Sequence, residues 1–198
     1  MSTSQSNKTS WQRIARRIRV PLGFVLAVAL ILLAQPSWKS LLLSLPFSAA
    51  GLWLRGYAAG YVKKNAELTR TGPYAHTRNP LYLGSILIAA GFAVAAGRWW
   101  MVVLLVLMFV AIYWPTILSE ETFLRATFPG FDDYARQVPR LGWRLTQPHF
   151  PDVQPHSGGF DPGRYRHHRE YNALIGAAAL YAVLAIRMWV GSSAHWRV

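Results

Sequence analysis

The chain has 198 residues, of which 53% are apolar, and it carries 21 Lys plus Arg against only eight acidic residues. The absence of cysteine excludes a disulfide framework, a thiolate nucleophile and cysteine metal ligands. A net charge of +13 suits either nucleic-acid binding or the basic cytoplasmic loops of a membrane protein. Long apolar runs favour the second class, so no nucleic-acid partner is expected.

The chain begins with a polar and then basic stretch, residues 1–19, which ends in Arg16, Arg17 and Arg19. No convincing small-residue cleavage site follows, so we interpret this stretch as an uncleaved cytoplasmic arm. It forms either an amphipathic turn on anionic membrane lipid or a disordered positive flank. The next segments are apolar. They divide the rest of the chain into the first two transmembrane helices (20–62), a core with the third and fourth (63–147), and a loop or lid with the fifth (148–198).

The five predicted spans differ in length. The fourth, 99–118, has no charge and is long enough for a hydrocarbon core of roughly 30 Å. The first, 20–33, is short for this purpose. The other three are expected at about 41–62, 81–96 and 171–190.

Loop charge predicts the orientation. With the N-terminus inside, the inner segments hold five basic residues in the arm, four in 63–80 and seven in 119–170, against three outside. The positive-inside rule therefore places the N-terminus in the cytoplasm, as in a bacterial inner-membrane protein. Both long polar segments then face the same side of the membrane, and chemistry is expected there.

The stretch 71–84 lies directly before the third span and contains two turn or breaker dipeptides, Gly72-Pro73 and Asn79-Pro80. The residue before each proline is disfavoured in helical angles, and Pro80 suits the first position of a new helix. Irregular backbone at the membrane is tolerated where it lines a protein cavity. We therefore predict that this stretch forms one wall of a ligand pocket.

The second polar segment carries an adjacent acidic pair, Glu120 and Glu121, shortly after Pro115. Pro115 is expected to kink the fourth span, and Ser119 can cap a new helical segment. Side chains at adjacent positions of a helix point in different directions. One glutamate can therefore face a cavity while the other holds an arginine.

A short helix is expected after the Pro129-Gly130 turn, capped by Asp132 or Asp133 and ended by Pro139. The spacing of Phe131, Tyr134 and Val138 gives it one apolar face. Arg140 follows at its exit, where a guanidinium can reach an anion.

Residues 147–170 are rich in proline, glycine and histidine and are interpreted as a loop, with a lid as one function. Its histidines lack the spacing of a metal motif, so no metal site is predicted.

Taken in order, Gly-Pro-Tyr at 72–74, Arg-Asn-Pro-Leu-Tyr-Leu-Gly at 78–84, Glu120-Glu121 and Val-Pro-Arg-Leu at 138–141 resemble the isoprenylcysteine carboxyl methyltransferase family and the related phospholipid methyltransferases. The resemblance covers a little under half of the chain. It implies an all-α polytopic integral membrane protein with about five transmembrane helices, a cytosolic cofactor-binding C-terminal half, and S-adenosylmethionine as methyl donor.

The same resemblance implies site roles. Cofactor binding falls on the stretch around the third span and on the second polar segment: Tyr74, His76, Arg78, Asn79, Pro80, Tyr82, Leu83, Glu120, Glu121, Tyr134, Val138 and Pro139. Arg140 and Glu121 are expected to act at the reacting groups. Eukaryotic members commonly have histidine where this chain has Asn79, and asparagine cannot act as a base.

The residue types in the two inner segments support an S-adenosylmethionine site without reference to the family. S-adenosylmethionine needs an acid for its ammonium or ribose, a cation for its carboxylate, and aromatic or apolar walls. The two inner segments offer all three. Arg55 lies inside the second span, where an arginine is a functional candidate, and it or Arg140 can orient a carboxylate. The alternative for Arg55 is snorkelling to the headgroups.

The predicted acceptor is a lipophilic or amphipathic small molecule reaching the site from the membrane. Carboxylate O-methylation is favoured, with N- or S-methylation as alternatives. Two other functions remain open, an NADPH-dependent membrane reductase of the sterol-reductase type and a non-enzymatic scaffold or transporter. The sequence carries no signal for an oligomeric state.

Overall fold

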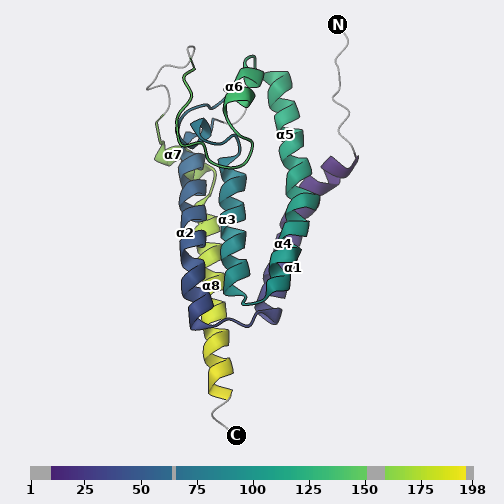
Figure 1. Cartoon of the computed structure of the whole chain (residues 1–198), viewed down its shortest axis with the longest axis vertical. Coiled ribbons are helices and arrows are strands. Elements are labelled where there is room, and N and C mark those ends of the chain that lie inside the picture. Colours follow the sequence, from purple (N-terminus) through teal and green to yellow (C-terminus); the bar gives the residue numbers. More distant parts are fainter. Residues whose placement is uncertain (1–9, 64–65, 151–158, 195–198) are drawn as a thin grey trace.

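The computed structural model describes residues 10–63, 66–150 and 159–194, and within these ranges every regular element is helical (Figure 1). The prediction of an all-helical fold is therefore confirmed for the described part of the chain. The long elements run along the long axis of the molecule. They are α1 (Ser10–Leu33), α2 (Trp38–Tyr61), α3 (Pro80–Ala95), the continuous α4 (Trp99–Met108), η2 (Phe109–Tyr113) and α5 (Trp114–Thr127), and α8 (Tyr171–Ala194).

Helix α1 is longer than the apolar segment 20–33 from which it was predicted, because it begins at Ser10 within the basic stretch and continues through Pro21. The arm expected over 1–19 is thus helical from Ser10, and residues 1–9 lie outside the described residues. Helix α2 begins with a capping box. Ser37 Oγ accepts from the Ser40 backbone N–H at 3.1 Å, and Ser40 Oγ accepts from the Ser37 N–H at 2.9 Å.

Helices α2 and α3 approach each other so closely that a side chain would not fit between them. A Cβ atom added to Gly51 would lie 2.5 Å from the Gly84 carbonyl oxygen and 2.8 Å from the Ile88 backbone nitrogen. Helix α3 begins at Pro80, as predicted, and the loop after it turns at Gly97, whose φ of +64° favours glycine. The glycine contacts hold the 71–84 stretch close to α2.

We predict that Gly51→Ala lowers the free energy of unfolding by about 1–3 kcal/mol, because the new methyl group forces two helix backbones apart. Thermal unfolding in detergent measures the loss. Gly23→Ala is the matched control, since a Cβ at Gly23 of α1 has no atom within 4 Å, and alanine is the better helix former. A loss as large at position 23 as at position 51 would contradict the packing argument.

The fourth span continues as one helical rod from Trp99 to Thr127. A π-helical turn, η2, lies just before Pro115, and the kink expected at Pro115 stays a prediction. The expectation that Ser119 caps a new helix is wrong, because α5 continues through Ser119, which is buried in its interior.

Two helical segments, Trp99–Thr127 and Tyr171–Val190, are long and apolar enough to cross a membrane. Large apolar side chains also remain exposed on the long helices, among them Leu107 of α4, Phe24 of α1 and Ile175 of α8. Apolar surface of this kind is typical of contact with lipid or another apolar partner. The structure is consistent with a membrane protein, and the count of about five spans stays a prediction.

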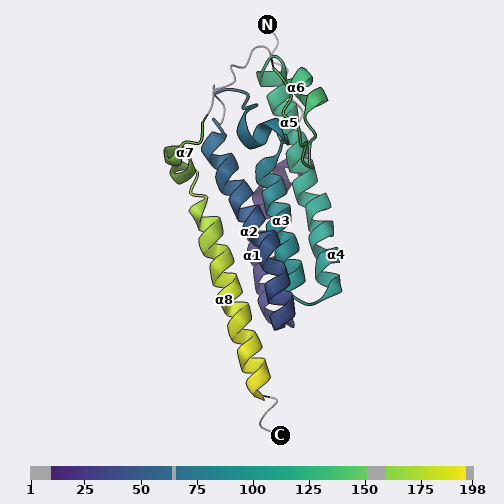
Figure 2. The ribbon, with the colours of Figure 1, turned by 60° about the vertical axis from the view of Figure 1, so that its left-hand side comes forward.

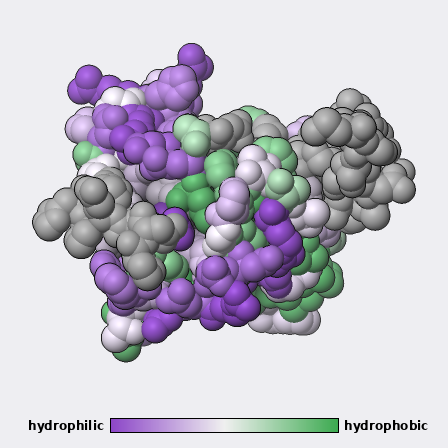
Figure 3. All heavy atoms as spheres, turned by 90° about the horizontal axis from the view of Figure 1, so that it is seen from above, coloured by the Kyte–Doolittle hydropathy of each residue, from purple (hydrophilic) through white to green (hydrophobic). Residues whose placement is uncertain are grey.

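The described parts of both polar segments gather at one end of the bundle, together with η1 (Gly72–Ala75), α6 (Phe131–Gln137) and α7 (Pro162–His167) (Figures 1 and 2). Seen from above, hydrophilic side chains form most of this end and surround a smaller hydrophobic area near its centre (Figure 3). Loop charge predicts that both segments face the same side of the membrane, and that orientation stays a prediction. The fold places them at one end of the molecule.

Helix α6 packs through its predicted apolar face. Phe131, Tyr134 and Val138 are buried together with Phe150. Its N-cap is Gly130, with φ +83°, and not Asp132 or Asp133, which occupy the first turn. The loop predicted over 147–170 contains α7, capped by the Asp161 side chain. Residues 151–158 of that loop, part of the proposed lid, lie outside the described residues.

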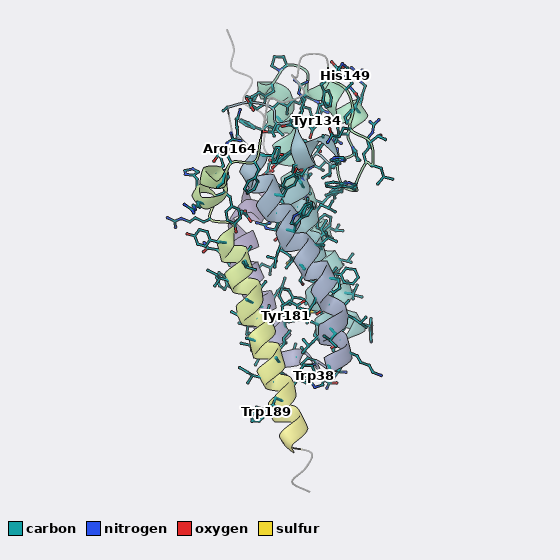
Figure 4. The ribbon with its side chains drawn as sticks, turned by 90° about the vertical axis from the view of Figure 1, so that its left-hand side faces the viewer. Trp38, Tyr134, His149, Arg164, Tyr181 and Trp189 are labelled. Atoms are coloured by element: carbon teal, nitrogen blue, oxygen red, sulfur yellow. The ribbon has the colours of Figure 1, made fainter. Side chains whose placement is uncertain are left out.

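Helix α8 runs alongside α2 and is joined to it by Tyr181 (Figure 4). The Tyr181 hydroxyl lies 2.8 Å from Ser48 Oγ and 2.9 Å from Ser44 Oγ, both on the buried face of α2. These hydrogen bonds satisfy two buried serine hydroxyls.

Candidate functional site

The polar end of the bundle contains a cavity of about 400 Å³, which we call the upper cavity. One side is formed by Val62, Lys63 and the segment 67–82, and the other by helices α5 and α6. Its volume lies in the range of small-molecule sites, roughly 300–1,000 Å³. The predicted site residues in its lining are Tyr74, Arg78, Asn79, Pro80, Tyr82, Glu120 and Tyr134.

The 71–84 stretch is irregular, as predicted, and it is fixed to the segment after α6. Tyr134 donates its hydroxyl to the Tyr74 carbonyl at 2.8 Å, and the Arg78 backbone N–H donates to the Pro139 carbonyl at 2.9 Å. Tyr74 and Tyr134 are both buried. Burial raises the pKa of Tyr74 and of Tyr134 above that of a free tyrosine, so both phenols stay neutral at ordinary pH.

Glu121 is the buried charge of the site, with 4% of its surface exposed. Arg140 donates to it three times, from Nε to both carboxylate oxygens at 3.0 Å and from Nη2 at 2.9 Å. Arg78 Nη1 lies 3.5 Å away, and Asn79 Nδ2 donates at 3.4 Å. One carboxylate therefore joins the 71–84 stretch, α5 and the segment after α6, which are far apart in the sequence.

The two arginines around Glu121 have different environments. Burial lowers the pKa of Arg78, with the Glu121 charge opposing that effect. For Arg140 the hydrogen bonds to Glu121 raise the pKa, against a smaller opposing effect of burial. Arg140 is a third exposed and lies over the Trp114 ring at 5.3 Å, whereas the Arg78 Nε is buried without a hydrogen-bond partner among the described residues. Arg78 is the guanidinium that lines the upper cavity.

Glu120 faces away from Glu121, as expected for neighbours on a helix. Its Oε1 accepts from the Tyr82 hydroxyl at 2.9 Å. Tyr82 and Glu120 line the upper cavity and also a second cavity of about 700 Å³, the lower cavity, which lies among α1, α3, α4 and α8. The Tyr82–Glu120 pair therefore forms part of the wall that the two cavities share.

Five of the predicted cofactor residues do not line the upper cavity: Glu121, described above, and His76, Leu83, Val138 and Pro139. His76 stacks on Trp143 with ring centroids 4.6 Å apart, and its Nδ1 lies 2.6 Å from the Arg144 carbonyl. Val138 is buried in the α6 cluster, and Pro139 contributes its carbonyl to Arg78. Leu83 lies one residue beyond Tyr82 on α3 and is half-buried. These residues support the wall of the site.

Arg55 lines the lower cavity. Its guanidinium is bound to Glu170 at 2.8 Å, a partner that the sequence analysis did not identify. Nothing in the spacing of positions 55 and 170 indicates this pair, because it arises from the docking of α7 and α8.

The apolar lining of the upper cavity was also missed, namely Phe123, Leu124 and Phe128 of the α5 end and Leu68 opposite them. The sequence offered one indication of this lining, because Phe123 and Leu124 follow the acidic pair closely in the chain. Within the described ranges no group of three histidine, aspartate or glutamate side chains is arranged to hold a metal ion.

The chain belongs to the phospholipid methyltransferase family, whose model matches residues 22–130. This confirms the resemblance read from the sequence and identifies the class as membrane methyltransferases. The matched region contains the 71–84 stretch, Tyr82, Glu120 and Glu121. Arg140, α7 and α8 lie beyond it.

Two curated relatives match over 95 residues each, which is 48% of this chain. The nickel-cobalt-cadmium resistance protein NccN of Alcaligenes xylosoxydans xylosoxydans is 37% identical, and the cobalt-zinc-cadmium resistance protein CzcN of Cupriavidus metallidurans is 35% identical. The matches span 44% and 43% of those relatives, so the chain covers less than half of their length. No solved structure matches this chain.

Proposed function

We propose that this protein is an S-adenosylmethionine-dependent methyltransferase that binds its methyl donor in the upper cavity and methylates a lipophilic or amphipathic acceptor. The observation that carries the proposal is the combination in one cavity of the Arg78 guanidinium, the Glu120 carboxylate and an apolar wall. Membership of the phospholipid methyltransferase family supports it.

The residues present fit the donor. Arg78, whose buried Nε has no described partner, suits a carboxylate such as that of the amino-acid end. Glu120 or Glu67, which both line the cavity, suit the ammonium or the ribose hydroxyls. Phe123, Phe128 and their apolar neighbours suit adenine and the sulfonium. When bound, the donor supplies an electrophilic methyl group.

The protein has to align the acceptor with that methyl group and exclude water. The wall shared by the two cavities is where this alignment can occur, because Tyr82 and Glu120 reach both spaces. The hydrogen bond between them holds the Glu120 carboxylate in a defined position. There it can attract a cationic head or accept the proton that an amine loses on methylation.

The charges around the lower cavity favour an amine over the carboxylate that the sequence analysis placed first. Among its described lining residues Arg55 is the one cation, and Glu170 already neutralises it. The Glu120 carboxylate is therefore the negative charge in the lining that no lining cation neutralises. A carboxylate beside Glu120 would be repelled, whereas an amine would be attracted.

The gathering of the polar segments at one end of the bundle and the loop charge support a proposal for the location. We place the polar end of the bundle at the inner membrane face, with the N-terminus in the cytoplasm. The metal-resistance names belong to the relatives. Such names are compatible with an enzyme that modifies a membrane component, which is the role we infer for this chain.

Ligand-induced stabilisation tests this proposal. S-adenosylhomocysteine, the demethylated form of the donor, should raise the unfolding temperature of the full chain in detergent, whereas NADPH should not. A ligand at one hundred times its Kd stabilises the folded state by about 2.7 kcal/mol. Stabilisation by NADPH alone would favour the reductase alternative, and stabilisation by neither ligand would refute both enzymes.

Methyl transfer is the complementary test. The protein should transfer labelled methyl groups from S-adenosylmethionine to a membrane extract, and Glu120→Gln should slow the transfer by about 100-fold if the carboxylate accepts the proton. Asp133→Asn is the control, because the Asp133–Arg136 pair is exposed and neither residue lines the upper cavity. Equal transfer rates for Glu120→Gln and wild type would remove Glu120 from the reaction.

A further inference from the structure

The lower cavity has polar side chains at one end and apolar ones along its length. Its polar end is formed by Arg55, Tyr82, Ser85, Glu120 and Glu170. The opposite end is closed by a buried apolar cluster to which Leu30, Met101 and Leu180 contribute. A cavity with this distribution matches a molecule that has one polar end and one hydrocarbon chain.

The depth of the cavity is that of one membrane leaflet. On the α8 side its lining extends from Glu170, just before the helix, to Leu180. Ten residues at 1.5 Å rise span about 15 Å, which is about half of the roughly 30 Å hydrocarbon core. A chain anchored at the polar end would therefore reach the closed end at the depth of a lipid tail.

The Arg55–Glu170 pair is held rigidly at the polar end. Arg55 donates to Glu170 from Nε at 3.1 Å and from Nη2 to both oxygens at 3.0 and 2.8 Å. Its Nη1 donates to Ser85 Oγ at 2.6 Å. The Glu170 side chain is 12% exposed and that of Arg55 is 24% exposed. The pair therefore connects α2, α3 and the start of α8 around the cavity mouth.

The position of Glu170 depends on the backbone before α8. The Asp161 N–H donates to the Gly60 carbonyl at 3.1 Å, and Arg164 Nη1 donates to the Gly60 and Tyr61 carbonyls at 3.3 Å. Arg169 then has φ +53°, a conformation that is uncommon for a side chain other than glycine, asparagine or aspartate. The docking of α7 on the end of α2 and this turn place Glu170 beside Arg55.

From these observations we infer that the lower cavity is the acceptor site for a single-chain amphiphile, and that Glu170 determines which head group it accepts. The hydrocarbon chain lies along α8 toward Leu180, and the head lies between the Tyr82–Glu120 and Arg55–Glu170 pairs. Glu170 acts through Arg55, whose positive charge it neutralises, so it is a positioning residue. This inference rests on the proposed function, because the shared wall brings the head next to the donor cavity.

Photochemical capture tests the site. The probes are hexadecylamine and the corresponding sixteen-carbon acid, each with a diazirine on the chain, added to the full chain in lipid nanodiscs. We expect the amine to be captured preferentially, with cross-links on α1, α3 and α8 residues of the lower cavity. Cross-links confined to the outer, lipid-facing side chains of the bundle would overturn the assignment.

Two variants make the test specific. Gly176→Leu fills the cavity from α8, where a Cβ at this position has no atom within 4 Å, and should reduce capture by about tenfold. Ala179→Leu, an exposed position of the same helix outside the lining, should capture as wild type does.

Glu170→Gln leaves Arg55 unneutralised and should shift the amine-to-acid capture ratio toward the acid by about tenfold. A role limited to holding the fold would reduce the capture of both probes equally.

S-adenosylhomocysteine binding is measured on the same samples. Retained binding in Gly176→Leu and Glu170→Gln shows that these variants are folded, and the wild-type cross-link map decides the question if they are not. Donor binding without capture in the lower cavity would refute this inference alone. Capture there without any donor binding would instead refute the proposed function.

Discussion

Replacing Glu121 by alanine is expected to lower the free energy of unfolding by about 3 kcal/mol, at the lower end of the range for breaking a buried ion pair. The variant leaves Arg78 buried without its counter-charge and removes three hydrogen bonds from Arg140. The lower end applies because the Arg140 side chain is 33% exposed and can regain water. Loss of S-adenosylhomocysteine stabilisation should accompany the lower stability, since Glu121 holds the 71–84 wall in place.

The matched comparison is Asp132→Ala. Asp132 accepts from Arg125 at 2.7 Å, but both side chains are more than half exposed. Exposed pairs contribute about 0–1 kcal/mol, so this variant should unfold close to wild type. Similar losses in Glu121→Ala and Asp132→Ala would show that the buried carboxylate does not hold the site together.

Replacing Arg78 by lysine is expected to weaken S-adenosylhomocysteine binding by about 10- to 100-fold while leaving the fold intact. Lysine keeps the positive charge near Glu121 but cannot offer the planar, two-donor face of a guanidinium. A hydrogen bond to a charged group contributes about 1.5–3 kcal/mol, which corresponds to this range of affinity. Isothermal titration calorimetry of the detergent-solubilised protein measures the change.

Arg136→Lys is the control for Arg78→Lys. Arg136 is 75% exposed and pairs only with the neighbouring Asp133 among the described contacts. Its replacement should leave affinity unchanged. An unaltered affinity in Arg78→Lys, with the protein folded, would move the donor carboxylate to another cation, and Lys63 at the rim of the same cavity would be the next to test.

The acidic pair illustrates how far the sequence could be taken. Adjacent glutamates on a helix must diverge, so one cavity-facing and one arginine-bound side chain could be predicted from spacing. The structure assigns these roles to Glu120 and Glu121 respectively. Which arginine binds Glu121 could not be predicted, because Arg78 and Arg140 approach it from segments 43 residues before and 19 residues after it.

Local rules account for the elements that were predicted correctly. Pro80 begins α3, and Phe131, Tyr134 and Val138 form the buried face of α6. The errors arose where tertiary packing overrides a local preference. Ser119 is a good helix-capping residue, yet it lies within α5 because the rod continues past the π-helical turn before it.

The sequence by itself determined the helical class, the grouping of the two polar segments, and the family to which the chain belongs. These features depend on apolar periodicity, charge counts and short motifs, all of which are local properties. Only the tertiary structure decided that two cavities share the Tyr82–Glu120 wall and that Glu170 neutralises Arg55. Both arrangements require helices distant in the chain to dock, and the energy of docking depends on surfaces that no local pattern contains.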